Sequence, residues 1–296
     1  MLHILEAGLR STVQDDPRVA GARIGLPDAG PADPVAFRAA RALVGERGGA
    51  AVEIVGLPFT FRSDDRRLVA VTGRDVAVRS ASRLPGWIAF VVRGGETVTV
   101  IGSARYAYLA IGGGLDLEPV LGSRATYLPA GIGPVPRPLA SGDALPLGPV
   151  RGLERAGVRV PPAPYGAAVA AIDGPHADRF GVDAVRAFFG DEFEVGPDAD
   201  RMGVRIRGPE LRWSGDDLLT CGVLPGAVQV PRGGSPIVLG PDAQTTGGYP
   251  VIAVVASAAR GLVAQALPGE RLRFARADPA RAVASLRALG ASAAAV

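Results

Sequence analysis

The sequence predicts a mostly β protein made of two tandem β domains that are related by duplication and carry only short helices. Many short segments rich in Val, Ile, Phe and Tyr lie between Gly, Pro and Asp residues, which is typical of strands joined by tight turns. Few segments have the apolar period of a helix. Landmarks of the first half also recur in the second half in the same order. With few helices to cover a parallel sheet, each half is expected to form a barrel or a sandwich.

In the first half, residues 31–45 predict a short helix. Asp33 is a good N-cap, Pro34 occupies the first helical position, and Gly45 provides a stop at the C-terminal end. Strands are expected where β-branched and aromatic residues alternate with turn residues. These segments are 68–72, 88–92, 97–101 and 106–111, with a closing strand near 144–147.

In the second half, residues 176–190 align with residues 31–45 without a gap. Six of the fifteen pairs are identical, among them Asp33 with Asp178 and Gly45 with Gly190. Both copies therefore predict one short amphipathic helix. Strands are expected at 237–239, 251–255 and 271–274, followed by a last helix that begins at Asp278-Pro279 and places Ala282, Val283, Leu286 and Leu289 on one face.

The length also favours two domains, because 296 residues suffice for two units that each bury a core. A stretch rich in Gly and Pro, residues 131–164, is interpreted as the connection between them. We place the first domain at residues 1–150 and the second at residues 151–296.

Composition excludes several functional classes. The chain contains no lysine, so all 32 basic residues are arginine, and the net charge is only +3. Because acidic and basic residues are interleaved, no basic stripe for nucleic acid is predicted. Cys221 is the single cysteine and His3 and His176 are the two histidines, so neither a metal site nor a disulfide framework is expected. The start of the chain lacks the pattern of a signal peptide and the most apolar stretch is interrupted by Arg260, which favours a cytoplasmic protein with no membrane span.

The absence of lysine also removes the P-loop, the Schiff base and the lysine general base. The glycine clusters 112–114 and 131–133 do not open a helical pattern, so they are predicted to be bends in a β fold. His176 and His3 are expected to be structural. Any ATP used in this system is expected to bind a partner.

Two polar segments could carry chemistry. The first is Asp198-Ala199-Asp200-Arg201-Met202-Gly203, where the guanidinium of Arg201 could hold a carboxylate or a phosphate, or could instead pair with the flanking acids. The second is Gln244-Thr245-Thr246-Gly247-Gly248-Tyr249-Pro250. Glycines let a ligand approach the backbone, and amide and hydroxyl groups can orient it or stabilise an oxyanion. The alternative for this segment is a tight bend whose side chains satisfy one another.

These two segments resemble signature sequences of the allophanate hydrolase subunit 2 family, which includes the C subunit of ATP-dependent 5-oxoprolinase, biotin-dependent carboxyltransferase domains of urea carboxylase, and KipA-like proteins. Further resemblance lies in Gly8-Leu9, Thr12-Val13-Gln14-Asp15, Gly30-Pro31-Ala32-Asp33-Pro34, Gly112-Gly113, and Leu121-Gly122-Ser123-Arg124 with Thr126. The match extends from about residue 5 to residue 275. It implies two cyclophilin-like β-barrel subdomains.

The resemblance also implies a function. We expect one component of an ATP-dependent hydrolase of a cyclic amide, namely the C subunit of 5-oxoprolinase, which is inactive alone. Its implied partners are a B-type protein homologous to allophanate hydrolase subunit 1 and an A-type protein of the LamB/YcsF class. One alternative is the carboxyltransferase component of a biotin-dependent urea carboxylase or allophanate hydrolase system. Another is a regulatory protein that binds a kinase inhibitor and performs no catalysis.

The resemblance implies the following site residues. The catalytic set is Arg201, Gln244, Thr245, Thr246 and Tyr249, and the substrate-binding set is Met202, Gly203, Gly247, Gly248, Gln14, Asp15 and Arg124. Arg201 would hold an anionic group, while Gln244, Thr245 and the backbone near Gly247 would stabilise an oxyanion. No residue is an evident nucleophile or base, so catalysis by positioning and electrostatics is expected.

Two departures from the family pattern bear on this site. Asp200 stands where relatives carry Ser or Asn, which would add negative charge beside Arg201. Pro134-Val135-Pro136-Arg137 stands where relatives are rich in glycine.

Overall fold

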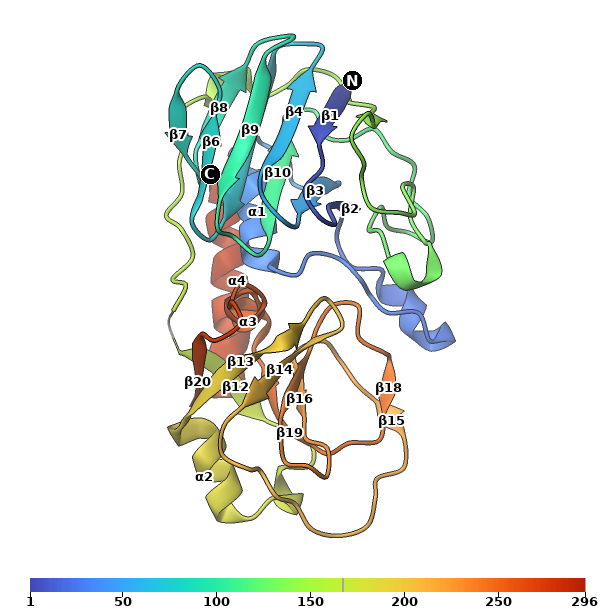
Figure 1. The fold of residues 1–296 in the computed structure, drawn as a ribbon, viewed down its shortest axis with the longest axis vertical. Helices are drawn as coiled ribbons and strands as arrows, with labels where there is room; N and C mark the ends of the chain where they lie inside the picture. The colour runs from blue at the N-terminus through green and yellow to red at the C-terminus, as the bar shows by residue number, and fades with distance from the viewer. Residues whose placement is uncertain (167, 296) are drawn as a thin grey trace. The chain divides into compact units, whose positions relative to one another are not determined.

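The computed structural model describes residues 1–166 and 168–295 of the chain. They divide into two compact units, and Figure 1 follows the chain through both. The first unit contains residues 1–18 and 29–163 together with the chain from residue 290 on, and the second contains residues 19–28 and 164–289. A short segment of the first half of the sequence therefore belongs to the second unit.

The first unit is built from two antiparallel sheets. One sheet has the strand order β11-β1-β4-β9-β6-β7 and the other has the order β2-β3-β10-β5-β8. The elements of this unit are β1 (Leu2–Glu6), β2 (Thr12–Gln14), α1 (Pro34–Leu43), β3 (Ala51–Ile54), β4 (Phe59–Ser63), β5 (Arg67–Gly73), β6 (Val76–Arg79), β7 (Arg83–Pro85), β8 (Ala89–Val92), β9 (Thr97–Gly102), β10 (Ala107–Ile111), the short 3-10 helix η2 (Leu128–Ala130), β11 (Ala144–Leu145) and η3 (Leu153–Arg155).

Alternation along the strands of the first unit builds its core. Every second residue of β4 and β9 is fully buried, as in the pair Phe59 and Phe61 and the pair Val98 and Val100. Because successive side chains of a strand point to opposite faces, these residues lie on one side of their sheet. Residues of both sheets share a single apolar cluster, so the sheets pack face to face.

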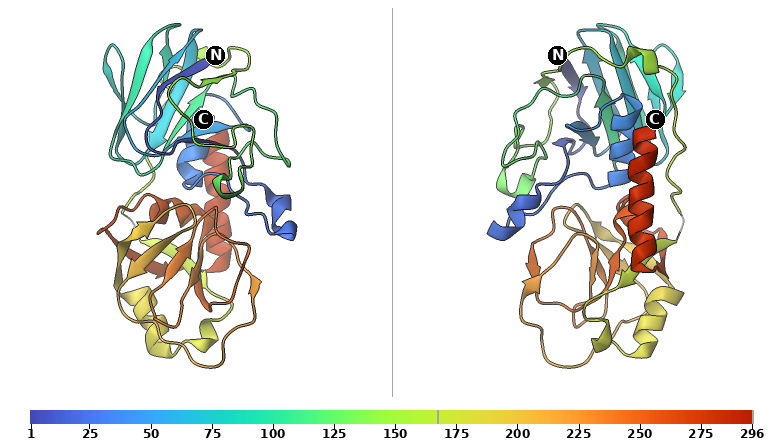
Figure 2. Two further views of the ribbon diagram at one scale, coloured as in Figure 1. Left: turned by 45° about the vertical axis from the view of Figure 1, so that its right-hand side comes forward. Right: turned by 180° about the vertical axis from the view of Figure 1, so that it is seen from behind.

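Helix α1 covers the outer face of the second sheet, where it contacts β5 and β10 (Figure 2). The ring of Phe37 packs edge-on against Tyr108 at 5.8 Å between centroids. Asp33 accepts hydrogen bonds from the amides of Val35 and Ala36, both at 3.1 Å, and so caps the helix as predicted. Gly45 follows the helix with φ +82°, which confirms it as the stop.

The second unit contains a closed barrel of seven strands in the order β12-β19-β16-β17-β14-β13-β20. Neighbouring strands are antiparallel except β12 and β20, which close the barrel in parallel. Its elements are η1 (Val19–Ile24), β12 (Val169–Asp173), η4 (Ala177–Arg179), α2 (Val182–Gly190), β13 (Glu192–Ala199), β14 (Gly203–Arg207), β15 (Cys221–Gly222), β16 (Ala227–Gln229), β17 (Ile237–Leu239), β18 (Thr246–Gly247), β19 (Val251–Val255), η5 (Ser257–Ala259), α3 (Arg260–Ala264), β20 (Arg271–Arg276) and the part of α4 (Pro279–Ala295) before residue 290.

The barrel has an apolar interior and a second, smaller apolar layer. Val228 of β16 and Val230 just after it belong to the interior cluster, whereas Ala227 belongs to the smaller one. That outer layer also contains Val223, Leu239, Ala243 and Val251. Its segments 221–223 and 243–247 include the two-residue strands β15 and β18, which pair with each other outside the barrel order. We call the paired strands β15 and β18 the ribbon.

The mostly β fold with short helices is confirmed, and the expected strands appear within one or two residues of their predicted bounds. The short helix predicted within residues 176–190 is present, but it begins later than the alignment with residues 31–45 indicates. A 3-10 turn at Ala177–Arg179 is followed by α2, whose N-cap is Gly181 and has no side-chain cap. Helix α4 begins at Pro279 as predicted, and Asp278 caps it by accepting from the amide of Ala280 at 2.9 Å. The side chain of Leu289 lies outside the described residues.

Candidate functional site

The segment from Gln244 to Pro250 contains β18, one of the two strands of the ribbon in the second unit. Gln244, Thr246 and Tyr249 are exposed, and Tyr249 shows 48% of its surface to solvent. Gly247 pairs with Cys221, whose thiol donates a weak hydrogen bond to the Gly247 carbonyl at 3.7 Å. These side chains therefore point outward from the ribbon, and the alternative of a bend closed on itself by its own side chains does not describe them.

The backbone of this segment is held on both sides. The amide of Val223 donates to the carbonyl of Thr245 at 2.9 Å, and the amide of Val230 donates to the carbonyl of Pro250 at 3.0 Å. The first bond ties the segment to the ribbon and the second ties it to the barrel. Thr245 is half-buried. The exposed amide, hydroxyl and phenol groups consequently stand on a fixed base.

Arg201 is joined to this segment through Asp242. Its Nε and Nη2 atoms each donate to one carboxylate oxygen of Asp242 at 2.7 Å, which is a bidentate pair. The pair is largely buried, with 12% of the arginine side chain and 5% of the aspartate side chain exposed. The Asp242 amide also donates to the Arg201 carbonyl at 3.0 Å. Of the alternatives left open for Arg201, the ion pair is present, and its partner is distant in sequence.

The acid beside Arg201 has a different task. One oxygen of Asp200 accepts from the amides of Met202 at 2.8 Å and Gly203 at 3.2 Å. This closes the turn between β13 and β14. The carboxylate of Asp200, which stands where relatives carry Ser or Asn, thus binds the backbone amides of Met202 and Gly203.

Gln229 was not identified from the sequence. It is the last residue of β16, only 1% exposed, and its Nε2 atom has no hydrogen-bond partner among residues 1–166 and 168–295. Its amide lies against Gly247, because a Cβ atom on Gly247 would be 2.6 Å from Nε2. A single amide in the apolar run 227–230 was the available signal. Without the pairing of the ribbon, nothing in the sequence placed it beside Gly247.

The candidates in the first unit serve its own loops. The Gln14 amide donates to the Thr12 hydroxyl at 2.9 Å and to the Thr126 carbonyl at 3.1 Å. Asp15 accepts from the backbone amide of Arg124 at 3.1 Å and pairs with its guanidinium at 3.4 Å. The structure therefore brings these three predicted residues together as supports of the chain around residue 124.

Arg18 completes this support and was not predicted. Its side chain is buried and donates to the carbonyls of Val120 at 3.1 Å and Ala125 at 2.7 Å. Burial lowers the pKa of its guanidinium, and the nearby carboxylate of Asp15 partly opposes that effect.

The two histidines have structural partners. Nδ1 of His176 accepts from the amide of Val251 at 3.2 Å, and Nε2 of His3 lies 2.8 Å from Oδ1 of Asp64. The glycine cluster after β10 is a bend, as predicted. The amide of Gly113 donates to the carboxylate of Glu46 at 2.8 Å, and a carbonyl of Pro149 lies against its Cα.

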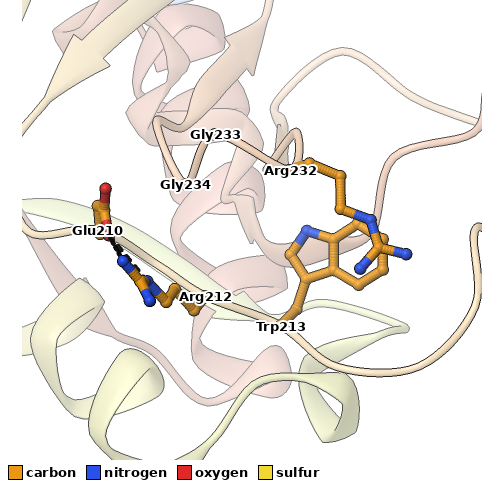
Figure 3. A pocket seen from close by; sticks show the side chains of 6 residues that line it. All are labelled: Glu210, Arg212, Trp213, Arg232, Gly233 and Gly234. Carbon is orange, nitrogen blue, oxygen red and sulfur yellow. Dashed lines mark hydrogen bonds and ion pairs between the residues drawn. The ribbon is translucent and has the colours of Figure 1, made fainter.

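A pocket of about 260 Å³ lies elsewhere on the second unit, lined by Glu210, Arg212, Trp213, Arg232, Gly233 and Gly234 (Figure 3). The guanidinium of Arg232 lies over the ring of Trp213 at 3.8 Å and also pairs with Asp217 at 2.9 Å. Arg212 pairs with Glu210 at 2.7 Å. Because each arginine already has an acid, the lining offers little net charge to a ligand.

Metal-binding clusters and membrane spans are both absent from the described ranges, 1–166 and 168–295. No group of three or more His, Cys, Asp or Glu side chains there could hold a metal ion. No helix within these ranges has the length and apolar character needed to cross a membrane.

The chain is similar to known proteins in both sequence and fold. A family model for the carboxyltransferase domain, subdomain A and B, matches residues 24–276. The chain is 36% identical over 288 residues to the C subunit of 5-oxoprolinase from Escherichia coli, covering 93% of this chain and 90% of that protein. The fold matches the K. lactis urea amidolyase with a TM-score of 0.91 at 26% identity, over 99% of this chain and 20% of that one.

A second solved structure, TTHA0988, matches with a TM-score of 0.82 and 33% identity over 92% of this chain. This chain spans 55% of its length, so both structural relatives are longer proteins that share the fold with it. The chain belongs to the carboxyltransferase domain family, subdomain A and B.

Proposed function

We propose that this chain acts as the C subunit of a 5-oxoprolinase and takes part in opening the lactam of 5-oxoproline to glutamate. The observation that carries this proposal is the 36% identity to the C subunit of the Escherichia coli 5-oxoprolinase across nearly the whole of both proteins. That relative is one part of a larger enzyme, so this chain is expected to act with partner proteins. We assign the partners as a B-type and an A-type subunit of the same enzyme.

The site supports a role in binding and orientation. Gln244, Thr246 and Tyr249 offer amide, hydroxyl and phenol groups to solvent on a base fixed by Val223 and Val230. Groups fixed in advance stabilise developing charge without reorganising during the reaction. These side chains therefore bind the amide substrate and the oxyanion that forms at its carbonyl.

Arg201 has a supporting role in this proposal. Two of its guanidinium nitrogens are used by Asp242, which lies two positions before Gln244. The residue therefore positions the turn that leads to Gln244, and the substrate carboxylate is held by other groups. Met202 and Gly203 likewise shape the turn through Asp200.

Two features of this chain support a partner protein as the site where ATP binds. The loop at Gly113 is filled by Glu46 and Pro149, and the chain has no lysine to reach a phosphate. The ATP consumed by the complex is therefore assigned to a partner protein.

The test reconstitutes the chain with its A-type and B-type partners and measures ATP-dependent release of glutamate from 5-oxoproline. The chain alone is expected to be inactive. Gln244→Ala and Thr246→Ala are expected to lower kcat/KM at least tenfold with unchanged melting temperature, because both side chains are exposed. Arg186→Ala, an exposed change on α2, is the matched control. Full activity of both loop variants would exclude the loop from the site.

A second function, carboxyl transfer, is favoured by the fold match to urea amidolyase over 99% of this chain. In that case biotin would arrive on a separate carrier protein, since the chain has no lysine to which biotin could be attached. Carboxylation of urea in the presence of a biotin carboxylase and carrier, with no opening of 5-oxoproline, would select this function.

A further inference from the structure

The buried amide of Gln229 is the strongest unexplained feature of the second unit. A buried hydrogen-bond donor without a partner loses its bonds to water on folding and gains none in return, which destabilises the fold. An apolar side chain of similar size would avoid that cost, since the surrounding layer of Val223, Ala227 and Val251 is apolar. Buried polar groups without partners call for a specific explanation, and functional sites are where folds tolerate them.

The side chain of Gln229 faces the ribbon. Val228 and Val230 belong to the interior cluster of the barrel, and Ala227 belongs to the outer layer. Because side chains alternate along a strand, Gln229 points outward with Ala227. There Gly247, in the middle of the segment from Gln244 to Pro250, covers the side chain of Gln229.

The contact is this close because residue 247 is a glycine. A Cβ atom at Gly247 would come within 2.6 Å of Nε2, which is closer than real side chains approach one another. The absence of a side chain thus lets the strand lie directly on the amide. The exposed residues Thr246 and Tyr249 flank this point on the outer side.

The ribbon that covers the amide is held by few bonds. Within residues 1–166 and 168–295, its strands pair at two positions, Cys221 with Gly247 and Gly222 with Thr246, next to the bond between Val223 and Thr245. It lies outside the barrel order, so its displacement leaves the barrel ladder intact. The bonds of Val223 to Thr245 and of Val230 to Pro250 fix the segment on either side of Gly247, so the displacement is confined to the short strand between them. A short stretch held by few backbone bonds opens at low free-energy cost.

We infer that Gln229 is a ligand-binding residue that the ribbon covers, and that its Nε2 donates a hydrogen bond to a carbonyl or carboxylate oxygen of a small amide substrate when the ribbon is displaced at Gly247. The ligand class follows from the chemistry, because an amide nitrogen donates and a carbonyl or carboxylate oxygen accepts. The choice of 5-oxoproline as a probe rests on the proposed function.

The decisive variant is Gln229→Met, which keeps the volume and removes both the donor and the acceptor. It is expected to melt at the same temperature as the unchanged protein or higher, because the unpartnered amide is gone. It is also expected to bind its ligand at least tenfold more weakly. The two effects together distinguish the roles. If Gln229 had only a structural role, its replacement would lower the melting temperature and leave the affinity for the ligand unchanged.

The affinity of the unchanged chain and of each variant is measured by isothermal titration calorimetry on the chain alone, with 5-oxoproline, glutamate and urea as three separate probes. In the unchanged chain, nuclear magnetic resonance follows the Gln229 side-chain amide. At least one probe is expected to shift that amide and to change hydrogen exchange of the backbone amides of the ribbon. Ile237→Met, in the same apolar layer, is the control and is expected to bind normally.

Two results would overturn the inference: no probe shifts the Gln229 amide, or Gln229→Met binds as tightly as the unchanged chain. Failure of the proposed function looks different. In that case the reconstituted complex releases no glutamate from 5-oxoproline, while a probe such as urea still binds and still requires Gln229.

Discussion

Arg201 and Asp242 form a pair whose energetics can be separated from catalysis. Both side chains are mostly buried, so removing one leaves the other charge without compensation. Arg201→Ala and Asp242→Ala are each expected to lower the free energy of unfolding by about 3–5 kcal/mol. The double variant is expected to lose clearly less than the sum of the two. Urea denaturation of the four proteins measures this coupling.

An additive result would mean that the two residues act independently, against the bidentate geometry. The pair also shows the limit of sequence reasoning at this scale. The motif around Arg201 pointed to the correct residue, but its partner lies 41 positions away. Only the pairing of β14 with β17 brings the turn after β17 to Arg201, and no spacing rule encodes that long-range contact.

The capping of α1 gives a prediction at the scale of elements. Asp33→Ala removes the acceptor for the amides of Val35 and Ala36 and is expected to cost about 1–2 kcal/mol of stability. Asp178→Ala is the matched control, since the aligned Asp178 is exposed and caps neither η4 nor α2. It is expected to change stability by less than about 0.5 kcal/mol. Chemical denaturation of both variants decides the matter, and equal losses would contradict the assignment of the cap.

The same two segments explain where prediction of elements succeeded. In the first copy, the N-cap Asp33, Pro34 at the first helical position and Gly45 after the last turn all indicate the same helix. Its bounds could therefore be predicted from these local signals. In the second copy, Arg179 replaces the proline and Gly181 interrupts the helix, which then begins at Val182. The six identical positions correctly predicted that the second copy contains a helix, but they did not predict where that helix begins. Strand positions were predictable because their signals are local, whereas the ribbon of two-residue strands gave no periodic signal.

At the scale of the whole molecule, surface carboxylates govern the response to acid. Hydrogen bonds from Arg137 lower the pKa of Asp143, those from Arg271 and Arg273 lower the pKa of Glu192, and those from the N-terminus and His3 lower the pKa of Asp64. Asp28 shows the opposite shift, because burial raises its pKa while Arg260 opposes this. Lowered pKa values predominate among these carboxylates.

A depressed carboxylate stabilises the fold fully above its unfolded pKa of about 4, and this contribution is lost as the pH falls through the lower folded value. Arg137→Gln is therefore expected to lower the melting temperature at about pH 7 and to match the unchanged protein at about pH 2. Melting curves between these values check the window. Since Arg137 is exposed, about 1 M salt is expected to shrink the difference at neutral pH. A difference that persisted in acid would assign the effect to packing.

The parallel pair of strands that closes the barrel affects how the protein folds during its synthesis. Val169 pairs with Phe274, so the first and last strands of the second unit meet only when the chain between them is complete. Pairing between strands that are distant in sequence also slows folding, because the chain between them loses conformational entropy before their contacts form. During synthesis the strands of the first unit are complete early, whereas in the second unit one edge of β12 stays unpaired until β20 has been made. Truncation just before β20 would leave that strand edge open and prone to aggregation.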